Sequence, residues 1–368
     1  MINSREGSVH EIFYCDDTIQ EILVEMGQTV EKAINYRFMT GTVQEGDRVI
    51  LNTTALDLGL GSGGWHFVMS ILTPPKAVVN TKKHIMKLRY TPFQLATGSC
   101  EEQGSPFYGL MKDACSLEGM PVLVGELHSM LPIVATYIKQ KNRDIRLVYI
   151  MTDKAALPLA FSHHVRTLKK ICFLAGTITI GQAFGGDLEA INIYSGLVAA
   201  KKIFQADLAI VCMGPGITGT STMLGFTGME QTEILHATAS LEGIPVLIPR
   251  ISSSDQRARH QGLSHHTRSV LKHTLISVHI PILEEFRPDD LGLHHWHLGE
   301  QSWVGDLRTV LTHYPEPIQT MGKSLDQDPL FFHSVALAAD FGLFLTMVSN
   351  DPYSPEDLSR KWEAWTSF

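Results

Sequence analysis

The sequence predicts an α/β protein in which a doubly wound, mainly parallel sheet follows a small N-terminal β-barrel-like domain. Short strand-like runs separated by turn residues fill residues 9–90, which is typical of a small antiparallel sheet or barrel. From about residue 105, apolar strand-like runs alternate with helix-length segments. These strands recur roughly every thirty residues, a spacing that suits successive βαβ units.

The N-terminal domain is expected over residues 1–95 and the α/β domain over 96–368, the latter with a C-terminal helical extension. The strand-like runs of the first domain are EILVEM, RVILNTTAL, WHFVMSIL and HIMKLRY. Strands of the α/β domain are predicted at 121–126, 145–151, 177–181, 207–213, 244–249 and 275–280. Helices are predicted at 131–141, 155–170, 187–204, 219–241 and 255–272. Asp187 is placed to cap the third of these helices.

The α/β domain contains a short sequence repeat of eight residues. SLEGMPVL (116–123) and SLEGIPVL (240–247) differ at one position. Each copy is expected to end a helix at its glycine, Gly119 or Gly243, before a proline opens a buried strand. Eight residues do not establish a duplication, so that origin stays open.

The composition disfavours several classes of protein. A net charge of −8 over 368 residues argues against nucleic-acid binding, because such proteins usually carry a basic footprint. The start, MINSREGSVHEI, lacks the basic and apolar regions of a signal peptide. The longest apolar run, 335–348, is too short to span a bilayer and contains Asp340. The five cysteines form no C-x-x-C pair, which disfavours a disulfide framework. We expect a cytoplasmic protein that binds neither nucleic acid nor membranes.

Polar, glycine-rich segments follow the predicted strands, and the carboxyl ends of parallel strands meet at one ligand-binding edge. GPGITGTST (214–222) stands out because it follows a strand and precedes a predicted helix, the setting in which backbone amides bind phosphate. A purely structural glycine turn is the alternative interpretation. No cofactor is identified, because Arg250 ends the next strand where a dinucleotide site needs an acidic residue. The residues expected to bind a small anion here are Gly214, Gly216, Thr218, Gly219, Thr220 and Ser221.

The stretch RARHQGLSHHT (257–267) is strongly basic and follows the strand next along the chain. Arg257, Arg259 and His260 are predicted to clamp a phosphate or carboxylate, because guanidinium groups bind both bidentately. A solvated helix face would have the same composition. The candidates for proton transfer or metal binding are Asp187, Glu189 and His265.

Whether a metal ion binds stays open from sequence. Its ligands would come from several loops, with Glu126 or His128 as further candidates, and no H-x-x-x-H spacing supports it. His265 and His266 are adjacent, so on a helix they are expected to point in different directions and not to share an ion. A serine triad has no support either, because a G-x-S-x-G elbow is absent.

Two aromatic segments lie towards the C-terminal end. LGLHHWHLGEQSW (291–303) is expected to form a lid, a subunit contact or a partly buried surface loop. A helix capped near Ser354 is expected to dock Trp362 and Trp365 on the body of the protein or on another chain. A homo-oligomer therefore stays open.

Several stretches together resemble an uncharacterised bacterial family, domain of unknown function 3866. They are GLGSGGWHFV, HIMKLRYTPFQ, GELHSMLP, GQAFGGDLEAIN, GPGITGTSTMLGF, RISSSDQRARHQGLSHHT and TMGKSLDQDPLFF, between residues 59 and 332. The resemblance implies one extended family unit. It implies no reaction, substrate or catalytic residue.

Two functions therefore stay open. In the first, the α/β domain binds a small anionic metabolite, such as a nucleotide or sugar phosphate, with or without acting on it as an enzyme. In the second, the protein is a non-enzymatic regulatory or assembly protein whose barrel or histidine-rich C-terminal segment binds other proteins. The two differ in whether residues 257–267 face the 214–222 loop or bulk water.

Overall fold

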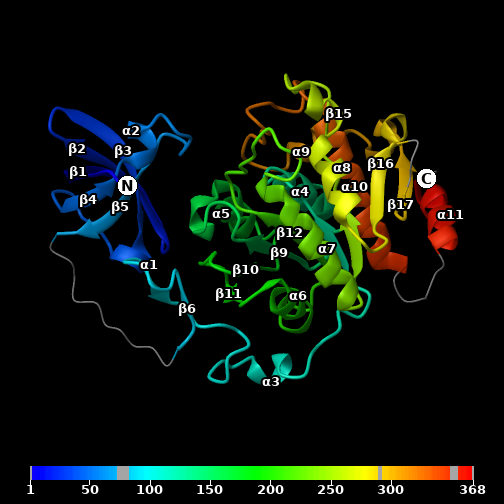
Figure 1. Ribbon diagram of the computed structural model, residues 1–368, viewed down its shortest axis with the longest axis horizontal. Helices are drawn as coiled ribbons and strands as arrows, with labels where there is room; N and C mark the ends of the chain where they lie inside the picture. Colours follow the sequence, from blue (N-terminus) through cyan, green and yellow to red (C-terminus); the bar gives the residue numbers. More distant parts are fainter. Residues whose placement is uncertain (1, 73–82, 289–291, 349–354, 367–368) are drawn as a thin grey trace. The chain divides into compact units, whose positions relative to one another are not determined.

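The computed structural model describes residues 2–72, 83–288, 292–348 and 355–366 (Figure 1). The chain folds into two compact units, Met1–Ala96 and Thr97–Phe368. Each unit has its own apolar core.

The first unit is a closed barrel with the strand order β1-β2-β3-β5-β4. Its strands are β1 (Ser4–Cys15), β2 (Ile19–Met26), β3 (Thr29–Tyr36), β4 (Arg48–Asn52) and β5 (His66–Ile71). Neighbouring strands pair antiparallel, except for the parallel pair β3–β5. Alternate residues such as Ile22 and Val24 fill the interior, as expected for strands with one buried and one solvent-exposed face. Two short helices, α1 (Arg37–Thr40) and α2 (Thr54–Asp57), and a ribbon of β6 (Met86–Lys87) and β7 (Leu95–Ala96) complete the unit.

The second unit is built on an eight-stranded parallel sheet with the order β11-β10-β9-β12-β8-β13-β16-β17. Its central strands β8, β9 and β12 consist mainly of Val, Ile, Leu and Met and are fully buried, because helices cover both faces. The strands are β8 (Pro121–Val124), β9 (Leu147–Thr152), β10 (Gly176–Thr179), β11 (Leu188–Glu189), β12 (Leu208–Met213), β13 (Ile244–Leu247), β16 (His279–Leu283) and β17 (His295–Gly299). The predicted fold class is confirmed.

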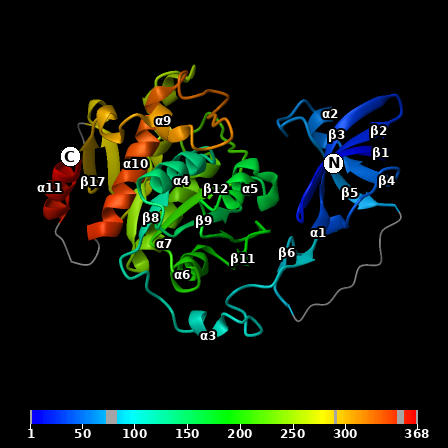
Figure 2. The same cartoon turned by 180° about the vertical axis from the view of Figure 1, so that it is seen from behind.

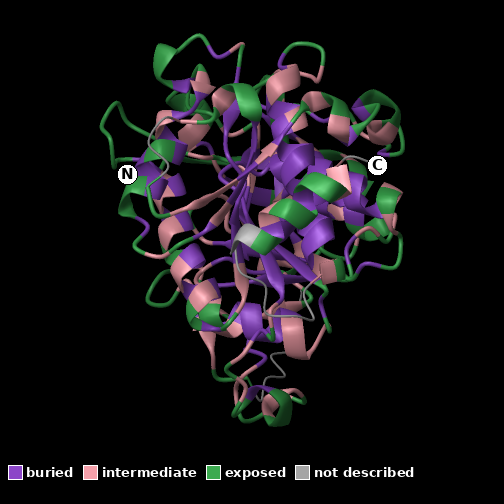
Figure 3. Cartoon of the chain, turned by 90° about the vertical axis from the view of Figure 1, so that its right-hand side faces the viewer, coloured by how far each residue is buried: buried purple, intermediate pink, exposed green. Residues whose placement is uncertain are grey.

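Helices pack on both faces of the sheet, and alternate strand residues supply the two cores. Tyr149 of β9 packs in one core, and its neighbours Val148 and Ile150 pack in the other. Figure 1 looks onto α3 (Tyr108–Met111), α6 (Ile193–Lys202), α7 (Glu230–Ser240) and α8 (His265–His273). Figure 2 looks onto α4 (Met130–Lys141), α5 (His163–Lys170), α9 (Leu307–Leu311), α10 (Pro329–Val348) and α11 (Pro355–Thr366). Buried strands form the centre of this three-layer arrangement (Figure 3).

Four helices begin later than the sequence predicts, and polar side chains cap three of them further along the chain. Ser162, Asn192 and Ser264 accept backbone N–H groups at the starts of α5, α6 and α8. Asp187 is therefore not a helix cap, and its carboxylate instead accepts the Thr177 amide at 2.9 Å. The predicted helix 219–241 begins only at Glu230, after a long loop.

The predictions for the C-terminal third also need correction. The segment 291–303, expected to be a lid, a contact or a surface loop, contains β17, which pairs with β16 at the edge of the sheet. Helix α10 has 20 residues, more than the predicted apolar run, and its length and composition would suffice to cross a membrane. However, 78% of its apolar window is buried inside the unit. Trp362 of α11 docks on the same unit and donates from Nε1 to the Leu298 carbonyl at 2.9 Å.

The two SLEGxPVL copies lie side by side and lead into the neighbouring strands β8 and β13. The Leu117 amide donates to the Leu241 carbonyl at 2.7 Å, and the Gly119 amide donates to the Glu242 carbonyl at 2.9 Å. A Cβ on Gly243 would lie 2.7 Å from Leu117 Cδ1. Only the second copy follows a long helix, α7. The shared sequence therefore makes two turns that pack against each other.

Candidate ligand site at the carboxyl edge of the sheet

Segments that follow three adjacent strands, β12, β8 and β13, meet at the carboxyl edge of the sheet. Glu126 follows β8, and its Oε1 lies 2.5 Å from His266 Nδ1. The Phe226 ring, from the segment after β12, stacks on the His266 ring with centroids 3.7 Å apart. A Cβ on Gly219 would lie 3.8 Å from His266 Nε2. The 214–222 loop and the 257–267 stretch therefore lie next to each other.

A network of ion pairs among Glu126, Arg250, Asp255 and Arg257 lies at this edge of the sheet. Arg250 donates from Nη1 to Glu126 at 3.0 Å and approaches Asp255 from Nη2 at 3.4 Å. Burial alone would raise the pKa of Glu126, but the His266 hydrogen bond and the Arg250 charge hold it below its usual value. Burial likewise opposes ionisation of Asp255, and hydrogen bonds from Arg257 hold its pKa well below the usual range. Both carboxylates are therefore charged.

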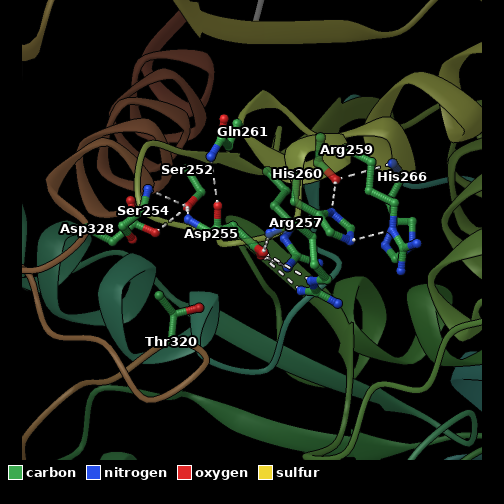
Figure 4. Close-up of polar contacts among 12 residues, drawn as sticks. Ser252, Ser254, Asp255, Arg257, Arg259, His260, Gln261, His266, Thr320 and Asp328 are labelled. Atoms are coloured by element: carbon green, nitrogen blue, oxygen red, sulfur yellow. Dashed lines mark hydrogen bonds and ion pairs between the residues drawn. The ribbon is translucent and has the colours of Figure 1, made fainter. Parts of the chain in front are cut away.

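The predicted clamp residues Arg257 and Arg259 differ in what they contact. Arg257 donates to both Asp255 oxygens, at 3.0 and 2.9 Å, so its guanidinium is already paired (Figure 4). Arg259 is exposed, and its Nε lies 3.5 Å from His260 Nε2. Among the residues that the structure describes, Arg259 forms no ion pair. Arg259 is thus the arginine of this stretch whose charge no carboxylate of the described residues neutralises.

The rings of three histidines lie close together beside this network, and one of them, His266, is bonded to Glu126. The ring centroids of His265 and His266 are 4.3 Å apart, and His260 lies 4.7 Å from each. The expectation that His265 and His266 point apart is wrong, because their rings lie against each other in the first turn of α8 and His260 packs against both. Burial lowers the pKa of His260 to about 3, and the Arg250 and Arg257 charges act in the same direction. Burial also lowers the pKa of His265, with His266 and Arg259 adding to it.

The glycine-rich loop differs from the expected phosphate cradle. The Thr218 amide donates to Thr227 Oγ1 at 3.2 Å, and the Thr220 amide donates to the Gly225 carbonyl at 2.7 Å. Helix α7 begins well beyond the glycines, so the loop has no helix N-terminus directly behind it. A Cβ on Gly214 would lie 2.7 Å from the Ala156 carbonyl oxygen, which gives that glycine a packing role. Residues 218–225, including Ser221, are exposed.

Asp187 and Glu189 are not brought to His265. Four strands separate β11, which carries Glu189, from β13. Lys169 Nζ lies 2.5 Å from Asp187 Oδ1, and Glu189 accepts from Thr179 Oγ1 at 2.7 Å and from the Gly185 amide at 2.7 Å. Both carboxylates therefore hold the β10–β11 edge together.

The structure adds Phe226 and Glu230, which sequence reasoning did not single out. Burial raises the pKa of Glu230 to about 7, and Thr152 donates to its Oε1 at 2.6 Å. An acidic residue in the first turn of a helix is ordinary, so the sequence carries no signal for this burial. Phe226 looks like any core aromatic in sequence. His128 is buried and bonded through Nε2 to Ser162 Oγ at 2.6 Å, as expected of a residue beyond a strand end.

A separate cavity of about 820 Å³ lies between α8 and the edge of the sheet at β17. It is lined by apolar residues such as Leu275 and by three cationic side chains, Arg268, Lys272 and Arg287. It contains none of the predicted site residues. This basic groove is therefore a second place where an anion could meet positive charge.

Comparison with known proteins assigns the chain to a family. A family model described as "Protein of unknown function (DUF3866)" matches residues 32–339. The match begins in β3 of the barrel and ends in α10 of the α/β unit, so it includes the residues at the carboxyl edge. A search of curated proteins finds no match. The chain belongs to the DUF3866 family, as its sequence motifs indicated.

Proposed function

We propose that the α/β unit binds a small phosphate- or carboxylate-bearing metabolite between the 214–226 loop and residues 257–266. The observation that carries this proposal is the exposed Arg259 guanidinium, which forms no ion pair among the described residues and lies on a segment that contacts the glycine-rich loop. Ligands of parallel α/β proteins bind at this edge of the sheet. Exposed hydroxyl groups, including that of Ser221, supply further donors from the loop.

The local charge balance favours an anion. The Glu126 and Asp255 carboxylates neutralise the two paired guanidinium groups of Arg250 and Arg257. Arg259 then adds one uncompensated positive charge at the surface. Guanidinium groups bind phosphate and carboxylate bidentately, and each charge-assisted hydrogen bond contributes about 1.5–3 kcal/mol.

Thermal unfolding of the full chain in inorganic phosphate, sulfate and citrate tests the proposal, with sodium chloride at matched ionic strength as the reference. A ligand at about 100 times its Kd stabilises the folded state by about 2.7 kcal/mol. Arg259→Ala removes the free cation, so we expect at least about tenfold weaker anion binding. Arg143→Ala is the matched control, because Arg143 is exposed and precedes β9 at the opposite edge of the sheet.

An anion response in the parent that Arg259→Ala reduces and Arg143→Ala leaves intact supports the proposal. Equal responses of the parent and Arg259→Ala contradict it. A parent that responds to none of these anions favours the non-enzymatic, protein-binding function instead. In that function the barrel or the histidine-rich C-terminal segment binds other proteins.

A further inference from the structure

The three imidazoles of His260, His265 and His266 form a cluster that anion binding alone does not explain. One ligand nitrogen from each ring lies within 4.8 Å of the other two. His260 and His266 are buried and His265 is partly buried. Burying three imidazole rings side by side costs free energy unless their nitrogens form hydrogen bonds or bind a ligand.

Several of these nitrogens have no partner in the described part of the chain. His265 Nδ1 and Nε2 and His266 Nε2 are buried without a hydrogen bond, and so is Glu126 Oε2. Buried polar atoms in native proteins are nearly always satisfied, so such a concentration at one point indicates a missing ligand. None of these atoms belongs to Arg259, the residue that carries the proposed anion site.

The rings are oriented as metal-binding histidines usually are. His266 uses Nδ1 for Glu126 at 2.5 Å, and His260 uses Nδ1 for Ser264 Oγ at 2.8 Å. Among the described residues His266 Nε2 has no hydrogen-bond partner, and His260 Nε2 accepts from the exposed Arg259 Nε at 3.5 Å. Metal-ligating histidines commonly bind a carboxylate or another polar group through the second nitrogen, which fixes the tautomer and the ring. Phe226 further fixes the His266 ring by stacking on its face.

From this geometry we propose that His260, His265 and His266 bind one divalent transition-metal ion of the zinc class through imidazole nitrogens. Zinc–nitrogen bonds are about 2.0–2.1 Å long, so the nitrogens of a tetrahedral site lie about 3.3–3.4 Å apart. The cluster therefore closes by at most about 1.5 Å when the ion enters, which side-chain rotation can supply. Three protein ligands leave a fourth position open to water or to an anion.

The positive charge of Arg259 repels a metal ion bound at this site. Its Nε lies 3.5 Å from His260 Nε2, and ion binding displaces that contact. Arg259 is exposed, so its charge is screened and its side chain can turn outward. Arg250 and Arg257 are each paired with a carboxylate. The site therefore tolerates the ion, and the ion and Arg259 together strengthen attraction for an anionic guest.

Equilibrium dialysis of the untagged full chain against Zn²⁺ alone, with elemental analysis, tests this proposal. We expect about one tightly held ion per parent chain. Co²⁺ substitution identifies the ligands, because bound thiolates give a sulfur charge-transfer band that imidazoles lack. This matters because Cys15, Cys115 and Cys172 are exposed.

His265→Gln is the decisive variant. Both ring nitrogens of His265 lack a hydrogen-bond partner of good geometry in the described structure, so we expect its replacement to remove one ligand and preserve the fold. We expect at least about tenfold weaker zinc binding. His313→Gln, an exposed histidine of the same unit, is the control and binds zinc as the parent does.

A parent chain that retains no zinc overturns the proposal, as does a His265→Gln variant that binds zinc as tightly as the parent. A Co²⁺ spectrum with thiolate bands also overturns it. Zinc is titrated without added anion, and the phosphate response of the preceding section is measured in a chelator. Failure of one proposal is thereby distinguished from failure of the other.

Discussion

Replacing Glu230 with glutamine should stabilise the α/β unit at neutral and alkaline pH and leave its stability unchanged near pH 4. Burial raises the pKa of this carboxyl from its usual value of 4.5 to about 7 in the folded state. Glutamine resembles the protonated carboxyl in shape and keeps an oxygen to accept from Thr152 Oγ1. The variant therefore avoids the cost of a buried negative charge.

The magnitude follows from the two pKa values. Between pH 4.5 and about 7 the unfolded chain has lost the Glu230 proton and the folded chain retains it, so the parent's free energy of unfolding falls as pH rises. A shift of about 2.5 units at 1.36 kcal/mol per unit gives a loss of about 3 kcal/mol, complete above about pH 8. Glu230→Gln should escape this loss.

Urea unfolding at pH 4.5 and pH 8, followed by tryptophan fluorescence, measures the difference. Four tryptophans, Trp296, Trp303, Trp362 and Trp365, report on the α/β unit, and Trp65 reports on the barrel. Glu242→Gln is the control, because Glu242 is exposed just beyond the same helix. A Glu230→Gln variant that is no more stable than the parent at pH 8, or equally stabilised at both pH values, refutes the reasoning.

Three further predictions concern groups that hold the carboxyl edge and the core. Arg250→Met leaves the Glu126 carboxylate without its guanidinium and should cost about 3–5 kcal/mol in urea unfolding, with partial recovery on adding Glu126→Gln. Gly214→Ala places a Cβ 2.7 Å from the Ala156 carbonyl oxygen and should lower stability by about 1–3 kcal/mol in the same assay. Trp362→Ala empties a fully buried site and should cost about 3–5 kcal/mol, seen as a lower Tm in calorimetry. Parent-like stability of any of the three would contradict the packing described here.

Hydrophobic patterning was sufficient to predict the sheet and the barrel. The central strands β8, β9 and β12 are apolar apart from Thr152 at the end of β9, because both faces of the sheet are covered. Helix starts were less predictable. Ser162, Asn192 and Ser264 act as caps within polar stretches where several residues could have done so. Strand β17 was missed because its histidines and tryptophan resemble a surface loop.

The sequence predicted which edge of the sheet the two candidate segments share, but not the partners of individual residues. Strand-end position predicts that the 214–222 and 257–267 segments converge, since that follows from parallel topology. Composition does not reveal ion pairs, so Arg257 and Arg259 looked equivalent. Arg257 is paired with Asp255, whereas Arg259 forms no ion pair among the described residues and contacts the neutral ring of His260. The convergence of His260 on the adjacent His265 and His266 depends on a loop folding back on α8, which no local periodicity encodes.

The crystal structure of the full chain soaked with tungstate, a heavy-atom analogue of phosphate, tests the central claim most directly. Our account predicts anomalous density within hydrogen-bonding distance of the Arg259 guanidinium, between residues 216–221 and His265. Density confined to the groove at Arg268 and Lys272, with none at Arg259, would contradict it. So would a structure in which the Phe226 and His266 rings lie apart.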